Sequence, residues 1–134
     1  MTSWALEYSF EVDEENAVIY EQITGSWKKD TAKRYHDDFM AEVQPLLGKP
    51  WAKLVDLRQW KTSYPDMVKV IGGHLNWCKE HNLALAINVL NNPSTYRQLN
   101  EMFPHGGVED IEHVFRTMEE GKAFLKEHWL DKRK

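Results

Sequence analysis

The stretch Trp51-Ala52-Lys53-Leu54-Val55-Asp56-Leu57 is a short, mostly apolar run. Runs of this kind occupy central positions in parallel sheets, where both faces are covered. We therefore expect a buried strand over residues 51–57, with Asp56 near its carboxyl end. Gly48 and Pro50 precede it and end the helix expected before it. A loop from Arg58 to Tyr64 is expected after it.

The residues before this strand predict a hairpin and a helix. Leu6, Tyr8, Phe10 and Val12 alternate with polar residues, as in a strand with one solvated face. Residues 17–23 are rich in β-branched and aromatic side chains and predict the antiparallel returning strand. Apolar residues at helical spacing then predict a helix over residues 30–47, with Asp30 as its N-cap.

The residues after this strand alternate between predicted helices and strands. Helices are expected over 65–80, 94–103 and 117–129, and strands over 83–90 and 111–115. Thr62 or Ser63 is expected to cap the first of these helices, and Thr117 with Glu120 has capping-box spacing. Pro104-His105-Gly106-Gly107 is predicted to be a loop. The order β-β-α-β-α-β-α-β-α predicts one α/β domain over residues 1–134, with a mixed, mostly parallel five-stranded sheet and four helices.

Composition narrows the function classes. The net charge of −4 argues against a nucleic-acid binder, which needs a basic face. The single cysteine excludes an internal disulfide, and the first ten residues do not resemble a signal peptide. The longest apolar stretch, 83–87, is far short of the roughly 20 residues that span a bilayer. We expect a cytoplasmic protein. The six tryptophans, which include Trp4, are expected mainly in the core.

No assembled active site is recognisable. His74 and Cys78 lie one turn apart on a predicted helix, but a structural zinc site needs four ligands and no second pair is evident. His36-Asp37-Asp38 is interpreted as a solvated helix face. The glycine pair Gly72-Gly73 is costly inside a helix, which suggests close approach of the sheet or of a partner. We expect no metal, no cofactor and no enzymatic activity; an enzyme would require a charged partner and a strongly perturbed pKa at Asp56 or His74.

The strand, its entry Gly48-Lys49-Pro50-Trp51 and the closing stretch VFRTMEEGKAFL (residues 114–125) carry a family resemblance. Together with the element order, they resemble the STAS-like fold of anti-sigma-factor antagonists, and more closely the bacterial SpoIIAA-like group. The resemblance implies a phosphorylated serine at the start of the helix that follows the strand. Asp56 matches the family's Asp, but Leu57 and Arg58 follow it where a serine would stand. Ser63 is then the candidate phosphorylation site, with helix capping as its alternative role.

The resemblance implies two kinds of function. The first is a non-enzymatic regulatory module that binds a protein partner. Its predicted surface is the loop after the strand, because α/β sheets bind ligands at the carboxyl ends of parallel strands. The residues predicted there are Asp56, Arg58, Trp60, Thr62, Ser63 and Tyr64. The alternative is a carrier of a small hydrophobic or lipid ligand, since the group is also similar in fold to CRAL-TRIO domains; Trp60, Tyr64, Met67 and Trp77 would then line the pocket. A homodimer through the first strand is a further expectation.

Overall fold

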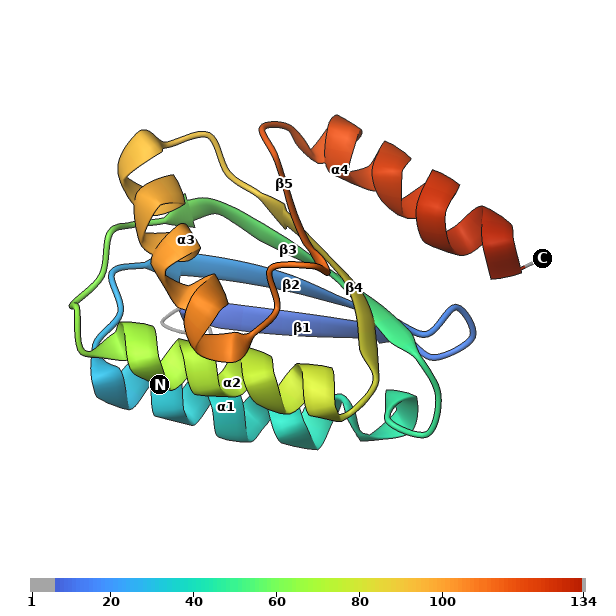
Figure 1. The fold of residues 1–134 in the computed structure, drawn as a ribbon, viewed down its shortest axis with the longest axis horizontal. Coiled ribbons are helices and arrows are strands. Elements are labelled where there is room, and N and C mark those ends of the chain that lie inside the picture. Colours follow the sequence, from blue (N-terminus) through green and yellow to red (C-terminus); the bar gives the residue numbers. More distant parts are fainter. Residues whose placement is uncertain (1–6, 134) are drawn as a thin grey trace.

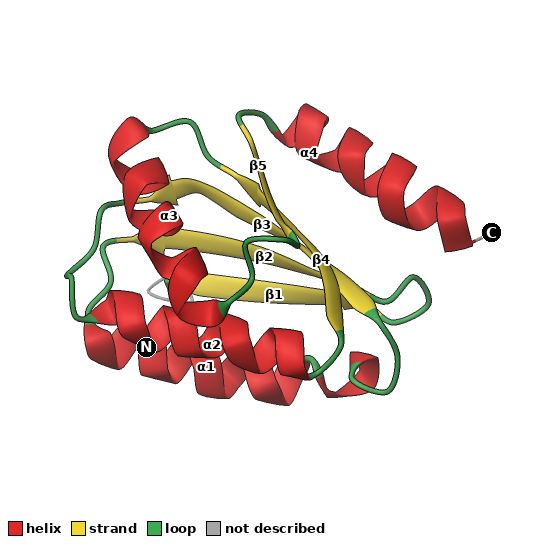
Figure 2. Ribbon diagram, viewed as in Figure 1, coloured by secondary structure: helices red, strands yellow, loops and turns green. Residues whose placement is uncertain are grey.

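The computed structural model describes residues 7–133, so the predicted positions Trp4 and Leu6 lie outside the described residues. Five strands form one sheet in the order β1-β2-β3-β4-β5. β1 (Tyr8–Asp13) pairs antiparallel with β2 (Val18–Gly25). β3 (Trp51–Trp60), β4 (Leu83–Val89) and β5 (Glu112–Phe115) continue the sheet in parallel (Figures 1 and 2). The predicted mixed sheet with an antiparallel first strand is confirmed.

Helices cover the two faces of the sheet unequally. α1 (Lys29–Glu42), α2 (Met67–Glu80) and α3 (Pro93–Gly106) pack on one face, and a 3-10 turn, Gln44–Leu46, follows α1. α4 (Met118–Leu125) packs against β3, β4 and β5 on the other face and continues as a single helical stretch through residue 133 (Figure 1). No helix within residues 7–133 has the length and apolar character needed to cross a membrane.

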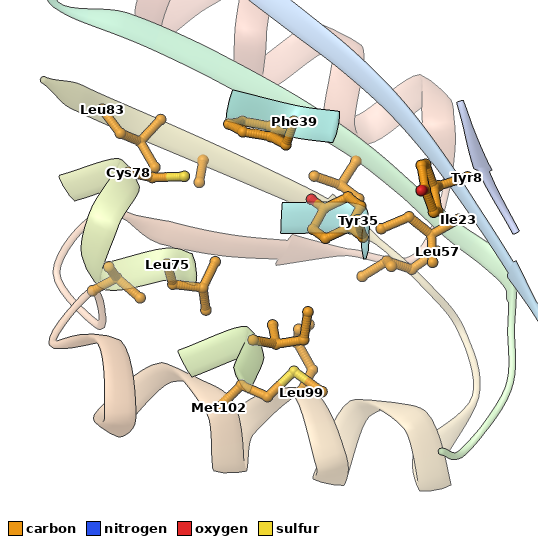
Figure 3. Packing of buried hydrophobic residues seen from close by; sticks show 14 of the residues in the cluster. Tyr8, Ile23, Tyr35, Phe39, Leu57, Leu75, Cys78, Leu83, Leu99 and Met102 are labelled. Carbon is orange, nitrogen blue, oxygen red and sulfur yellow. The ribbon is translucent and has the colours of Figure 1, made fainter. Parts of the chain in front are cut away.

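The alternation of side chains along β3 divides the core. Trp51, Val55 and Leu57 point into the larger cluster beneath α1, α2 and α3, whereas Ala52 and Leu54 pack toward α4. The close-up in Figure 3 shows Leu99 and Met102 extending from α3 into the larger cluster. The prediction that the tryptophans lie mainly in the core is confirmed for Trp27, Trp51 and Trp60, which are buried, while Trp77 and Trp129 are partly buried.

Two predicted boundaries around β3 are wrong. The strand continues to Trp60 instead of ending at Leu57, because Gln59 and Trp60 still pair with Thr24 and Gly25 of β2 after a register shift. The loop therefore begins at Lys61. α2 begins at Met67 after a turn, and no side chain caps it, so neither Thr62 nor Ser63 is its N-cap.

The capping predictions have mixed outcomes. Asp30 lies in the first turn of α1 and does not cap it; Lys28 occupies the N-cap position. α3 includes Pro104 and extends through Gly106, so residues 104–106 are helical, and Gly107 ends the helix in the left-handed conformation at φ 65°. Thr117 caps α4 as predicted, because its hydroxyl accepts the Glu120 N–H at 3.1 Å.

Candidate functional site

The carboxyl ends of β3, β4 and β5 form one edge of the sheet, because these strands are parallel. Three segments leave this edge: the loop between β3 and α2, the loop between β4 and α3, and the residues after β5. We call this the carboxyl edge, and it includes residues 58–66, 90–96 and 115–117. Most of the residues predicted to bind a partner lie there, but the structure divides them into exposed and buried groups.

Asp56 and Arg58 form an ion pair on one face of β3. Arg58 Nε and Nη2 each donate to a carboxylate oxygen of Asp56 at 2.9 Å, and the Arg58 backbone N–H donates to Oδ1 at 3.1 Å. These hydrogen bonds lower the pKa of Asp56. Asp56 borders a groove beside α4, which Lys122 also lines. The pair fixes the Arg58 guanidinium, whose side chain is 45% exposed, at the carboxyl edge.

Ser63 and Trp60 are buried and hold the loop in place. The Ser63 hydroxyl accepts hydrogen bonds from the Trp27 backbone N–H at 2.7 Å and from Trp60 Nε1 at 3.0 Å, and it donates to the Lys61 carbonyl at 2.9 Å. Gln98 of α3 accepts the Ser63 N–H at 2.7 Å and donates to the Ser63 carbonyl at 2.9 Å. The loop is thereby fastened to α3. A phosphoryl group on Ser63 would replace the hydrogen donated to Lys61, so phosphorylation at Ser63, which stays a prediction, requires the loop to open.

Two exposed aromatic rings lie at the carboxyl edge, one on the loop that Ser63 holds in place and one at the start of α3. Tyr64 is 53% exposed, and the Lys28 ammonium lies 5.8 Å from its ring centroid. Tyr96, in the first turn of α3, is 49% exposed. Within residues 7–133, these two are the exposed large hydrophobic side chains, and both follow strands that end at the carboxyl edge. Thr62 is also exposed and presents its carbonyl to Ser26 at 3.0 Å.

A second group of polar side chains lies inside the core and was not predicted. It consists of charged and polar residues on the inward faces of the strands and on α1: Glu21, Tyr35, Lys53, Asn88 and Glu112. Lys53 Nζ lies 3.9 Å from Glu21 Oε2, and the Tyr35 hydroxyl donates to Glu21 Oε1. Asn88 Nδ2 donates to Glu112 Oε1 at 2.7 Å. We call these five residues the buried polar cluster.

Burial dominates the electrostatics of the buried polar cluster. It raises the pKa of Glu21 and of Glu112, and Lys53 partly offsets both shifts. Burial acts to lower the pKa of Lys53, but the nearby Glu21 opposes this effect, and the pKa lies above its usual value. Lys53 therefore remains a cation inside the core. Its single positive charge interacts with the carboxyl groups of both Glu21 and Glu112.

The sequence carried a signal for the buried polar cluster. Lys53 stands between Trp51 and Val55 on the face of the strand that the period-two alternation sends into the core. Glu21 stands in the same way between Ile19 and Ile23 on β2. A charged residue at an inward position of a buried strand needs a partner of opposite charge. Two oppositely charged residues at inward positions of adjacent strands therefore predict a buried ion pair.

His74 and Cys78 contact each other on α2. Cys78 Sγ lies 3.6 Å from His74 Nε2, and His74 Nδ1 lies 2.8 Å from Nδ1 of His36 on α1. The interpretation of residues 36–38 as a solvated face is therefore wrong for His36, which is half-buried against α2, and right for Asp37 and Asp38, which are exposed, although Asp38 also accepts a hydrogen bond from the Tyr8 hydroxyl. Within residues 7–133, no group of three or more acidic, His or Cys side chains is arranged to hold a metal ion.

Burial raises the pKa of Cys78 to about 12, so thiolate is scarce at neutral pH. We expect the native protein not to react with a thiol-directed disulfide reagent at pH 8 over the time in which the urea-unfolded chain reacts completely. A spectrophotometric thiol titration measures both rates. Fast reaction of the native chain would contradict this placement of Cys78.

Two solved structures share the arrangement of strands and helices described above. The crystal structure of an anti-sigma factor antagonist from Mycobacterium paratuberculosis matches with a TM-score of 0.59 and 15% sequence identity, over 91% of this chain and 97% of that chain. The NMR structure of the protein TM1081 matches with a TM-score of 0.58 and 12% identity, over 94% of this chain and 92% of that one. Comparisons with protein-family models and with curated proteins give no match. The fold is therefore STAS-like, as the resemblance implied.

Proposed function

We propose that this chain is a non-enzymatic regulatory module that binds a protein partner through the carboxyl edge. The observation that carries the proposal is the pair of exposed rings at that edge, Tyr64 on the loop after β3 and Tyr96 in the first turn of α3. Tyrosine and arginine are enriched in protein interfaces, and Arg58 and Arg116 lie at the ends of β3 and β5. The shared fold with an anti-sigma factor antagonist supports a partner of the anti-sigma-factor kind.

Rigid presentation of these rings supports the same proposal. The hydrogen bonds between Ser63 and Gln98 hold the backbone next to Tyr64, and Asn92 caps the helix that carries Tyr96 by accepting the Ser94 N–H at 2.8 Å. A preorganised surface loses less conformational entropy on binding. In this proposal Asp56, Trp60 and Ser63 position the surface, while Arg58, Thr62 and Tyr64 contact the partner.

The non-enzymatic part of the proposal is supported by how the titratable groups are engaged. Asp56, the carboxylate nearest the carboxyl edge on β3, is held by Arg58, and its pKa is lowered, which disfavours a role as a general acid. Burial, with a smaller effect of nearby Lys53, lowers the pKa of His74 well below its usual value, and the ring is enclosed between Tyr35, Phe39 and His36, away from the surface where a substrate would bind. We place the module in the cytoplasm because its single cysteine is a free, buried thiol. A homodimer through β1, which forms an edge of the sheet, stays a prediction.

The lipid-carrier alternative has weaker support. Trp60 and Met67 do line an internal cavity, but its volume is about 50 Å³. Pockets for drug-sized ligands measure roughly 300–1,000 Å³. Tyr64 and Trp77, also predicted as pocket walls, are elsewhere: Tyr64 is on the surface, and Trp77 stacks on His81 at 4.2 Å between centroids.

Partner binding is tested with the full chain. Immobilised protein first captures partners from a lysate of the source organism, and the dissociation constant is then measured for the purified partner by calorimetry. We expect Tyr64→Ala and Tyr96→Ala each to weaken binding about 30-fold, the effect of losing an interface anchor worth about 2 kcal/mol. Their melting temperatures should match the native chain, since both rings are exposed.

Lys49→Ala is the matched control, because Lys49 is exposed before the amino end of β3, at the opposite edge. It should bind as tightly as the native chain. If both tyrosine variants keep native affinity while Lys49→Ala loses it, the partner surface is at the amino edge and the proposal is wrong.

A further inference from the structure

A row of side chains across the sheet leaves space beneath α2 and α3. In the strand register, Lys53 of β3 lies opposite Ala86 of β4, and Ala86 lies opposite Glu112 of β5. Lys53 and Glu112 are thus two strand spacings apart, about 10 Å between Cα atoms. The methyl group of Ala86 is too short to fill the space between their longer side chains, so the ammonium and carboxyl groups face a common volume.

That volume is the internal cavity of about 50 Å³. Its polar wall comes from His74 and from four members of the buried polar cluster, all except Glu21. Its apolar wall comes largely from α2, α3 and the end of β3, including Leu57, Met67, Leu99 and Met102. In Figure 3, Leu99 and Met102 extend from α3 toward the region that Tyr35 and Leu57 enter from the other side. A buried water needs roughly 10–15 Å³, so the cavity has room for several waters or for one small organic molecule.

The polar wall contains groups whose hydrogen bonding is incomplete. Glu112 lines the cavity and is buried, and its Oε2 has no hydrogen-bond partner within the described part of the chain, since Asn88 occupies only Oε1. Lys53 also lines the cavity, and the distance of 3.9 Å between its Nζ and Glu21 Oε2 is too long for a hydrogen bond. A buried polar atom without a partner is costly, so an occupant that donates to Glu112 Oε2 and also accepts from Lys53 gains free energy.

The required occupant combines a donor, an acceptor and a short apolar part. A hydroxyl group donates one hydrogen bond, to Glu112 Oε2, and accepts others, from Lys53 Nζ. It does so without adding charge to a core that already contains one ammonium and two carboxyl groups. A carboxylate would add a second anion beside Glu112, and an ammonium could not accept from Lys53.

We propose that this cavity is a binding site for a small uncharged hydroxyl compound, such as a short-chain alcohol, held between Lys53 and Glu112 with its alkyl part against Leu57, Leu99 and Met102. The cavity lies in the core, whereas the partner surface is exposed, and Trp60 borders both. A failure here leaves the proposed partner binding unaffected, because the two are measured with different probes.

The test is a titration of the full chain with 1-propanol, followed by methyl NMR signals of leucine and methionine side chains. For a ligand of four heavy atoms, the affinity attainable per atom gives a dissociation constant on the order of 1 mM. We expect saturable shifts at Leu57, Leu99 and Met102. Propionate and propylamine, which have the same chain length, should bind at least about tenfold more weakly.

Two variants separate ligand binding from solvent effects. Leu99→Phe fills the cavity with a larger apolar side chain, and Glu112→Gln removes the acceptor at the same size; each should weaken 1-propanol binding about tenfold or more. Glu109→Gln, at an exposed position three residues before Glu112, should bind as the native chain does. Melting temperatures show whether each variant is folded. If Glu112→Gln does not fold, Leu99→Phe still tests the proposal.

Two outcomes would overturn the proposal. Shifts that rise linearly without saturation, and equally in Leu99→Phe, would show that the cavity holds water only. Binding of propionate or propylamine as tight as that of 1-propanol would show that the hydroxyl assignment is wrong.

Discussion

Replacing Lys53 with methionine should lower the free energy of unfolding by about 3–5 kcal/mol, the cost of leaving a buried ionic partner uncompensated. Lys53 is the cation of the buried polar cluster, and it partly offsets the burial that raises the pKa of Glu21 and Glu112. Without it, both carboxyl groups must take up protons or remain charged inside the core. Urea unfolding monitored by circular dichroism measures the loss as a shift of the midpoint at unchanged slope.

The pH dependence gives this prediction a definite sign. Because burial raises the folded-state pKa of Glu21 and Glu112 above the usual 4.5, the folded chain binds protons more readily than the unfolded chain. This contribution to stability is complete below about pH 4.5 and is lost as the pH rises through the folded pKa values. Loss of Lys53 raises those pKa values further, so Lys53→Met should be closest to the native chain at acidic pH and least stable at pH 8.

A double variant controls for packing. Lys53→Met with Glu21→Gln removes both ions of the closer pair, but it leaves Glu112 as a buried carboxyl group without the cation. It should recover at pH 8 the part of the lost stability that arises from Glu21. If Lys53→Met alone were as stable as the native chain at both pH values, the ammonium would not be compensating the buried carboxyl groups.

Gly72→Ala should destabilise the protein by about 1–3 kcal/mol, the usual cost of overpacking, even though alanine favours helices over glycine by about 1 kcal/mol. A Cβ atom on Gly72 would lie 2.3 Å from the Cβ of His105, which is fixed to the α3 backbone. The two helices would have to move apart. The glycine pair predicts close approach of the sheet or of a partner; in the structure it is α3 that makes the approach, at Gly72.

Gly73→Ala is the matched control for the same helix. A Cβ atom there has no atom within 4 Å, so only the propensity term acts, and the variant should be about 1 kcal/mol more stable than the native chain. Thermal unfolding of the two variants side by side tests the difference in sign. Equal effects of both substitutions would contradict the close contact between α2 and α3.

Local patterns predicted the fold well because most helices and strands have a recognisable residue pattern within their own stretch of sequence. The apolar run 51–57 marked a buried strand, the alternation before it marked the hairpin, and Thr117 with Glu120 marked the start of α4. The errors occur where contacts with residues distant in the sequence determine where a strand or helix ends. Trp60 belongs to β3 because Gly25 pairs with it, and Pro104 is helical within α3 although proline usually interrupts a helix.

The candidate sites depend even more on distant partners. Arg58 and Asp56 are two residues apart and could be linked by sequence, but the roles of Trp60 and Ser63 arise from Trp27 and Gln98, which lie about 35 positions away on other elements. The buried polar cluster joins side chains from four strands and a helix. The sequence pattern places the charged residues Glu21 and Lys53 at inward-facing positions. It does not show how β2 and β3 align, so it does not show that these two side chains meet.

Trp60 belongs to both of the places where we propose binding. Its ring lines the internal cavity, and its Nε1 donates to the Ser63 hydroxyl that holds the loop before Tyr64. Any occupant of the cavity that displaces this indole therefore displaces the surface that faces a partner. Thermodynamic linkage then requires reciprocity: the factor by which the occupant changes partner affinity is the factor by which the partner changes affinity for the occupant. Through this one indole hydrogen bond, binding of a small metabolite would change the affinity for the protein partner, and binding of the partner would change the affinity for the metabolite.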